Sequence, residues 1–106
     1  MSPKLRAVIK AHKKAHAFWL SVCGCTDTLK LGREATADEE ALWDKGNDGE
    51  YAALWDVCRF PARTTADQAA KGRYLRKFHS WKFGYLEEDQ VDALMLSMIE
   101  AGKGAK

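Results

Sequence analysis

The chain has 106 residues, of which 46% are hydrophobic, and its formal net charge is +2. This length is enough for one hydrophobic core, so we expect a single domain over residues 1–106. Three cysteines cannot all pair within one chain, and they lack the density of a secreted disulfide scaffold. No segment has the pattern of a signal peptide or the length of a membrane span, so the sequence favours a cytoplasmic protein that does not enter a membrane.

The first expected helix covers about residues 3–23. Ser2 is a suitable N-cap, and Pro3 stands at the first helical position, where its missing N–H is not needed. Gly24 is a plausible end. The residues that recur at three- and four-residue steps, and therefore share one face, are Leu5, Val8, Ile9, His12, His16, Trp19 and Cys23.

The second expected helix covers about residues 37–59. Thr36 and Glu39 have the spacing of a capping box at its start, and Pro61 follows its end. Two glycines within residues 45–50 disfavour helix and leave a break there as an alternative. We favour one helix because a set of positions keeps helical phase across the glycines: Leu42, Gly46, Gly49, Ala53 and Val57.

Two further helices are expected near the C-terminus. The third covers about residues 66–83, with a capping box formed by Thr65 and Gln68. Its apolar stripe is Ala66, Ala70, Tyr74, Phe78, Trp81 and Tyr85. The fourth covers about residues 86–101 and ends before a frayed tail at 102–106. Its expected inward face is Val91, Leu94, Met95, Met98 and Ile99.

No segment alternates as a strand does, so the predicted fold class is all-α. Short links between the second, third and fourth helices favour a small bundle of about four helices with antiparallel neighbours. The charge is basic, acidic, basic and acidic in four successive blocks. Helices of opposite charge that lie side by side would gain modest stabilisation, about 0.2–1 kcal/mol per exposed pair.

Three segments of the chain carry a resemblance to known proteins: Ala11-His12-Lys13-Lys14-Ala15-His16-Ala17-Phe18, Phe60-Pro61-Ala62-Arg63-Thr64-Thr65 and Gly72-Arg73-Tyr74-Leu75. With these segments the chain resembles a diffuse group of small helical proteins from alphaproteobacteria and their prophages. The group has a first helix with histidines, a long helix that ends in a proline, and a third helix with a Tyr-Leu pair. The resemblance implies a helical fold and a bacterial or phage setting. It implies no activity and no functional residue.

A zinc site is one alternative for the first helix and the loop after it. His12 and His16 are one helical turn apart, and Cys23 and Cys25 follow, so the four side chains offer ligands that zinc accepts. They lack the Cys-x-x-Cys spacing of zinc modules, and a cysteine is often only a small buried hydrophobic residue. We therefore expect these residues to pack without metal, and we expect no cofactor.

Nucleic-acid binding is a second alternative. The third helix interleaves aromatic residues with Lys71, Arg73, Arg76, Lys77 and Lys82, which suits a surface that neutralises phosphates and stacks on bases. The same spacing is typical of a core stripe opposite a solvated basic face.

Protein binding is the function that the sequence favours. No nucleophile elbow, phosphate loop or His-Glu-x-x-His motif is present, so we do not expect an enzyme. Four tryptophans are many for so small a core, and exposed aromatic residues often anchor interfaces. Trp43 and Trp55 are the candidate contact residues, for another protein or for a second copy in a homodimer.

Overall fold

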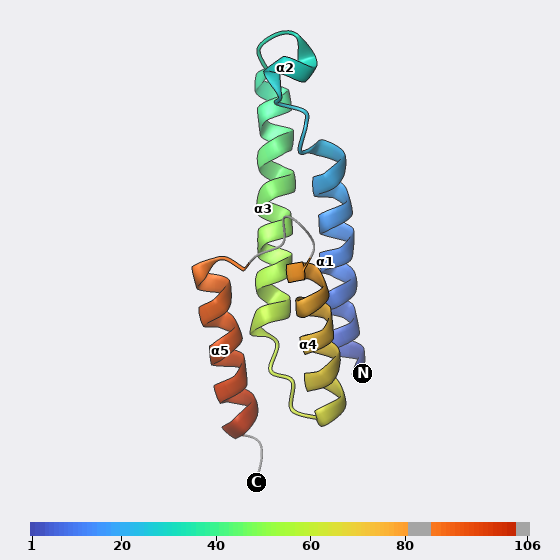
Figure 1. Cartoon of the computed structure of the whole chain (residues 1–106), viewed down its shortest axis with the longest axis vertical. Helices are drawn as coiled ribbons and strands as arrows, with labels where there is room; N and C mark the ends of the chain where they lie inside the picture. The colour runs from blue at the N-terminus through green and yellow to red at the C-terminus, as the bar shows by residue number, and fades with distance from the viewer. Residues whose placement is uncertain (81–85, 104–106) are drawn as a thin grey trace.

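The computed structural model describes residues 1–80 and 86–103, and every regular element in this part of the chain is a helix. The helices are α1 (Pro3–Val22), α2 (Thr28–Leu31), α3 (Ala37–Arg59), α4 (Thr65–Ser80) and α5 (Glu88–Lys103) (Figure 1). The all-α prediction is confirmed. The one-turn helix α2 adds a fifth helix to the four that the sequence predicts.

The long helices α1 and α3 form a hairpin that spans most of the molecule (Figure 1). Their close contact depends on Gly46, which is buried. A Cβ atom at this position would lie 2.5 Å from Val22 Cγ2 and 3.3 Å from a ring carbon of Trp19. A side chain there would force the helices apart. α3 continues without a break through both glycines, as predicted, because packing against α1 compensates for their low helix propensity.

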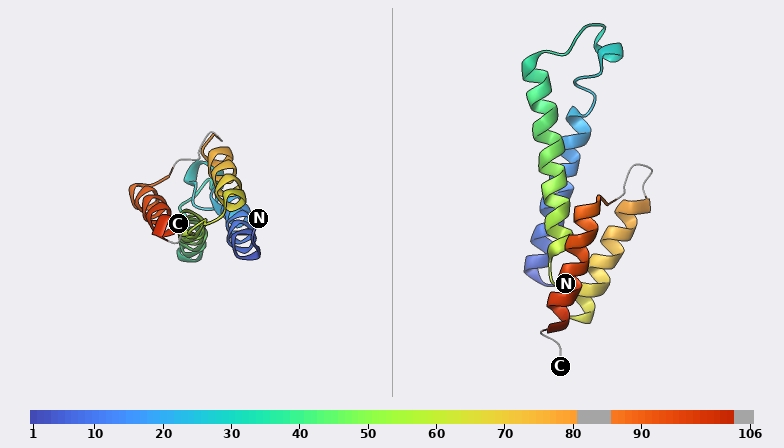
Figure 2. Two further views of the ribbon diagram at one scale, coloured as in Figure 1. Left: turned by 90° about the horizontal axis from the view of Figure 1, so that it is seen from below. Right: turned by 90° about the vertical axis from the view of Figure 1, so that its left-hand side faces the viewer.

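Helices α4 and α5 cover only one end of this hairpin. α5 packs on α3, while α4 lies against α1, and the molecule measures 60 × 22 × 21 Å (Figures 1 and 2). The end of the hairpin near α2 extends beyond both helices. Apolar side chains are exposed there, among them Phe18, Leu20 and Leu42.

The hydrophobic core lies at the end of the hairpin that α4 and α5 cover. Its buried members come from four helices: Leu5, Ile9, Leu54, Val57, Cys58, Leu75 and Ala93. Burial of this apolar surface supplies the main driving force for bringing the four helices together.

A buried lysine closes the C-terminal end of α3. Lys71 Nζ donates to the carbonyl oxygens of Cys58 and Phe60, both at 2.7 Å, and to Ser97 Oγ at 2.6 Å. A cation at this position also meets the negative end of the helix dipole. Burial lowers the pKa of Lys71 to about 8 and raises the pKa of the Cys58 thiol to about 11. One side chain thus connects α3, α4 and α5.

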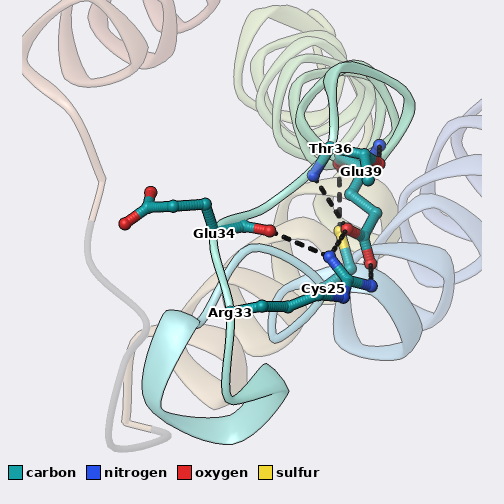
Figure 3. A network of polar contacts seen from close by, with 5 residues as sticks. All are labelled: Cys25, Arg33, Glu34, Thr36 and Glu39. Carbon is teal, nitrogen blue, oxygen red and sulfur yellow. Dashed lines mark hydrogen bonds and ion pairs between the residues drawn. The ribbon is translucent and has the colours of Figure 1, made fainter.

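The predicted capping box at the start of α3 is confirmed. The Glu39 N–H donates to Thr36 Oγ1 at 3.1 Å, and the Thr36 N–H donates to Glu39 Oε1 at 2.9 Å. Arg33 adds two hydrogen bonds to the same carboxylate and one to the Glu34 carbonyl, while the Cys25 thiol donates to the Glu39 carbonyl (Figure 3). The hydrogen bonds from Arg33, and second the one from the Thr36 N–H, lower the pKa of the Glu39 carboxyl group to about 2.

The start of α4 differs from the prediction. The cap is Thr64, whose Oγ1 accepts a hydrogen bond from the Asp67 N–H at 3.1 Å, so Thr65 is already helical. The expected end of this helix at residues 81–83 lies outside the described residues, as do Trp81 and Tyr85 of its predicted stripe.

The buried face of α4 also differs from the predicted stripe. Ala66 is exposed, while the buried line consists of Asp67, Lys71 and Leu75. Ala70, Tyr74 and Phe78 pack beside this line, against the core. The prediction missed the line because hydrophobic periodicity takes no account of buried polar residues. Asp67 is buried because its carboxylate accepts a hydrogen bond from the Ser2 N–H at 2.7 Å.

Candidate functional site

Helix α5 is turned relative to the predicted orientation. The residues that it buries against the rest of the molecule are Gln90, Ala93, Ser97 and Ala101. Four of the five residues that the sequence predicted as its inward face are exposed: Val91, Met95, Met98 and Ile99. Only Leu94 is partly buried against the core. The predicted inward face of this helix is therefore wrong.

Hydrogen bonds explain why the small and polar side is the buried one. Gln90 Nε2 donates to the Tyr51 carbonyl at 3.1 Å, and Gln90 Oε1 accepts from the Glu87 N–H at 2.9 Å. Ser97 Oγ accepts from Lys71 and donates to the Leu94 carbonyl. Each buried polar side chain thus has partners, and small residues between them let α5 approach α3.

The opposite side of α5 is a large apolar surface, which we call the outer face. It consists of Val91, Met95, Leu96, Met98 and Ile99, whose exposed fractions are 38–66%. Contiguous apolar patches of this kind are uncommon on soluble monomers and usually mark a contact with another molecule. Methionine suits such a surface because its flexible thioether adapts to different partners.

Charged residues lie at both ends of the outer face. Asp92, Leu96, Ile99 and Lys103 are exposed and follow one another at helical spacing, so a carboxylate and an ammonium stand at opposite ends of an apolar line. Glu100 is on another side, where it pairs with Arg59 at 2.6 Å.

The two tryptophans predicted as contact residues are half-buried. The Trp43 ring packs edge to face against Trp19, with ring centroids 5.1 Å apart, near the end of the hairpin that α4 and α5 leave uncovered. Trp55 packs against the hydrophobic core. The two lie twelve residues apart along α3, roughly 18 Å, so they do not form one patch. Their role in partner binding stays a prediction.

The predicted basic surface of the third helix is only partly present. Arg73, Arg76 and Lys77 are exposed on α4, whereas Lys71 is buried and bound to the end of α3. Lys82 lies outside the described residues. Lys71 is therefore not available for phosphate contacts, and nucleic-acid binding by the other residues stays a prediction.

A cluster of polar side chains connects α1, α3 and α4. His12 is buried; its Nε2 lies 2.8 Å from Glu50 Oε1, and its Nδ1 forms a hydrogen bond with the Tyr74 hydroxyl. His16 Nδ1 lies 3.7 Å from the same carboxylate oxygen. The ring of Phe78 packs edge-on against both imidazoles. Burial raises the pKa of Tyr74 to about 12, with a smaller contribution from the nearby Glu50 carboxylate. The Tyr74 hydroxyl therefore stays protonated.

This cluster opens into a pocket between α1 and α4 with a volume of about 350 Å³. Its wall combines the two histidines with apolar and basic side chains: His12, His16, Leu20, Phe78, Lys13 and Lys77. A pocket of this size and composition suits a small ligand that is apolar in part and anionic in part.

The cysteines do not join the histidines. Cys23 is exposed at the end of α1, and its thiol donates to the Leu20 carbonyl. The Cys25 thiol donates to the Glu39 carbonyl at the start of α3. The side chain that lies with the histidine pair is Glu50, which the sequence analysis did not connect with the histidines. Glu50 is 38 residues from His12, so only the packing of α3 on α1 brings the two together.

Comparisons with protein families, with curated proteins and with solved structures found no match. Among the described helices, none combines the length and the apolar character needed to cross a lipid bilayer.

Proposed function

We propose that this protein acts by binding protein rather than by catalysis, and that the outer face of α5 pairs with the same face of a second copy. The observation that carries the proposal is the orientation of α5. The helix turns its small and polar residues toward α3 and leaves its largest apolar residues outside. A free monomer leaves these apolar side chains in contact with water, so the outer face is best explained as a surface that a partner covers.

Charge complementarity favours a second copy as this partner. A two-fold axis near residues 97 and 98 would place two α5 helices antiparallel. Asp92 of each copy would then meet Lys103 of the other, and Leu96 would meet Ile99. Asp92 and Lys103 are eleven residues apart, about 16 Å along the helix, and both are exposed. The pairing therefore buries the apolar line between two ion pairs.

The oligomeric state tests the proposal. We expect a dimer by light scattering coupled to size-exclusion chromatography at about 100 µM, well above a micromolar dissociation constant. Ile99→Asp should shift the protein to monomer because it places a carboxylate in the centre of the contact. Leu20→Asp is the matched control, since Leu20 is 59% exposed and Ile99 is 58% exposed, but Leu20 lies on α1.

A charge exchange tests the register. Asp92→Lys and Lys103→Asp should each weaken the dimer by about tenfold or more, because each sets like charges opposite one another. The double variant restores opposite charges and should recover most of the affinity. A wild-type monomer at the same concentration would contradict the proposal, as would a dimer that Leu20→Asp disrupts and Ile99→Asp does not.

A further inference from the structure

The histidine cluster has the composition of a metal site with three protein ligands. His12, His16 and Glu50 each offer one ligand atom, and the three atoms lie within 4.8 Å of one another. Two histidines and one glutamate form a known set for zinc sites that keep a position open. The histidines reach the same point because they are one turn apart on α1, and Glu50 reaches it from α3.

The distances between ligand atoms agree with this assignment. Two atoms bound to Zn²⁺ at 2.0–2.1 Å in tetrahedral geometry lie about 3.3–3.4 Å apart. Here His12 Nε2 is 2.8 Å and His16 Nδ1 is 3.7 Å from Glu50 Oε1. These two separations differ from the ideal value by about 0.6 Å and about 0.4 Å, which rotation of the half-buried Glu50 and His16 side chains can accommodate.

The surroundings of His12 are those of a positioned ligand. Its second ring nitrogen is held by the Tyr74 hydroxyl, and Phe78 packs against the ring. Metal-bound histidines usually have such a partner on the other nitrogen, which fixes the tautomer and the orientation of the ring.

We propose that His12, His16 and Glu50 bind one divalent zinc ion, with a fourth position open toward the pocket between α1 and α4. The sequence alone favoured no metal because the set of histidines and cysteines lacked the spacing of zinc modules. In the fold, Glu50 meets the histidines in place of the two cysteines. The fourth position takes water or an anionic oxygen ligand, such as a carboxylate. Lys13 and Lys77 at the pocket wall favour an anion there, and Leu20 and Phe78 favour an apolar body attached to it.

Zinc titration of the full chain tests the site. After treatment with a chelator, calorimetry with ZnCl₂ should give one equivalent of tightly bound metal, and zinc should raise the melting temperature, because binding to the folded state adds to its stability. Co²⁺ should give the intense visible absorption of a tetrahedral site. His16→Ala and Glu50→Gln should each weaken zinc binding more than about 100-fold, beyond the roughly 10- to 100-fold cost of changes outside the ligand set.

The double variant Cys23→Ser, Cys25→Ser is the control, because it removes the alternative ligands and should leave zinc affinity unchanged. His16 and Glu50 are only half-buried, so both ligand variants should keep the helical circular dichroism of the wild type. No binding by the wild type would overturn the proposal. So would binding that survives both ligand variants, or that is lost in the cysteine variant. The site is on α1 and α3, so this result is independent of pairing through α5.

Discussion

Replacement of Lys71 by methionine gives the most direct test of how α3, α4 and α5 are held together. Methionine keeps an unbranched apolar stem of similar length but removes the ammonium. The carbonyl oxygens of Cys58 and Phe60 then lose their shared donor, and Ser97 loses its contact with α4.

The magnitude follows from the groups that are left without partners. A buried carbonyl without a donor costs about 1–3 kcal/mol, so the two together cost about 2–6 kcal/mol. Removal of a buried charge recovers part of this cost. We expect Lys71→Met to lower the free energy of unfolding by about 3 kcal/mol and the melting temperature by roughly 10–20 °C.

Urea denaturation at fixed protein concentration measures this loss. Arg73→Met is the matched control, because Arg73 is an exposed cation on the same helix and should change stability by less than about 0.5 kcal/mol. A loss below about 1 kcal/mol in Lys71→Met, or an equal loss in both variants, would refute the assigned role of Lys71.

The pH dependence of the stability provides a second test of the same variant. Burial lowers the pKa of Lys71 from 10.5 to about 8, so between these values the unfolded chain binds more protons than the folded one. The contribution of Lys71 to the free energy of unfolding of the wild type therefore rises as the pH rises from 8 to 10.5. The difference in stability between the wild type and Lys71→Met should widen from pH 8 to 10.5, and a constant difference would contradict the pKa shift.

Two further predictions concern α3. Gly46→Ala should destabilise the protein by about 1–3 kcal/mol, because the new Cβ atom would collide with Val22. Gly49→Ala should stabilise it by up to about 1 kcal/mol, because a Cβ atom there has no other atom within 4 Å and alanine favours helix more than glycine does. Thermal melting of the two variants beside the wild type measures both effects. Hydrogen bonds from Arg33 lower the pKa of Glu39 from 4.5 to about 2, so its contribution is present above pH 4.5 and is lost as the pH falls toward 2. The wild type should lose more stability than Glu39→Gln in that interval, as acid titration followed by circular dichroism would show.

Local signals in the sequence were sufficient to predict where the two helices of the hairpin, α1 and α3, begin and end. The Ser2 and Thr36 caps and the proline at position 61 act on neighbouring backbone groups, so their effect is visible without knowledge of the fold. The boundaries of α1 and α3 agree with the predictions within one residue for this reason. The start of α4 was predicted one residue late because Thr64 and Thr65 offer the same hydroxyl, and only the backbone decides which one is the cap.

Tertiary structure decided which faces of the helices are buried. α5 carries apolar residues around much of its circumference, so periodicity alone does not select one side. The choice was made by Gln90 and Ser97, whose partners Tyr51 and Lys71 come from α3 and α4. A buried polar group needs a partner distant in sequence, and such a pairing leaves no periodic signal along the chain.

The histidine cluster also depends partly on local sequence and partly on tertiary structure. The sequence determined that His12 and His16 share one face of a helix, because their spacing is one helical turn. It did not determine their third neighbour. Glu50 reaches them because Gly46, one turn earlier in α3, has no side chain and lets α3 lie close against α1. The local spacing of ligands is thus encoded in one helix, while the set that meets at one point depends on how closely two helices pack.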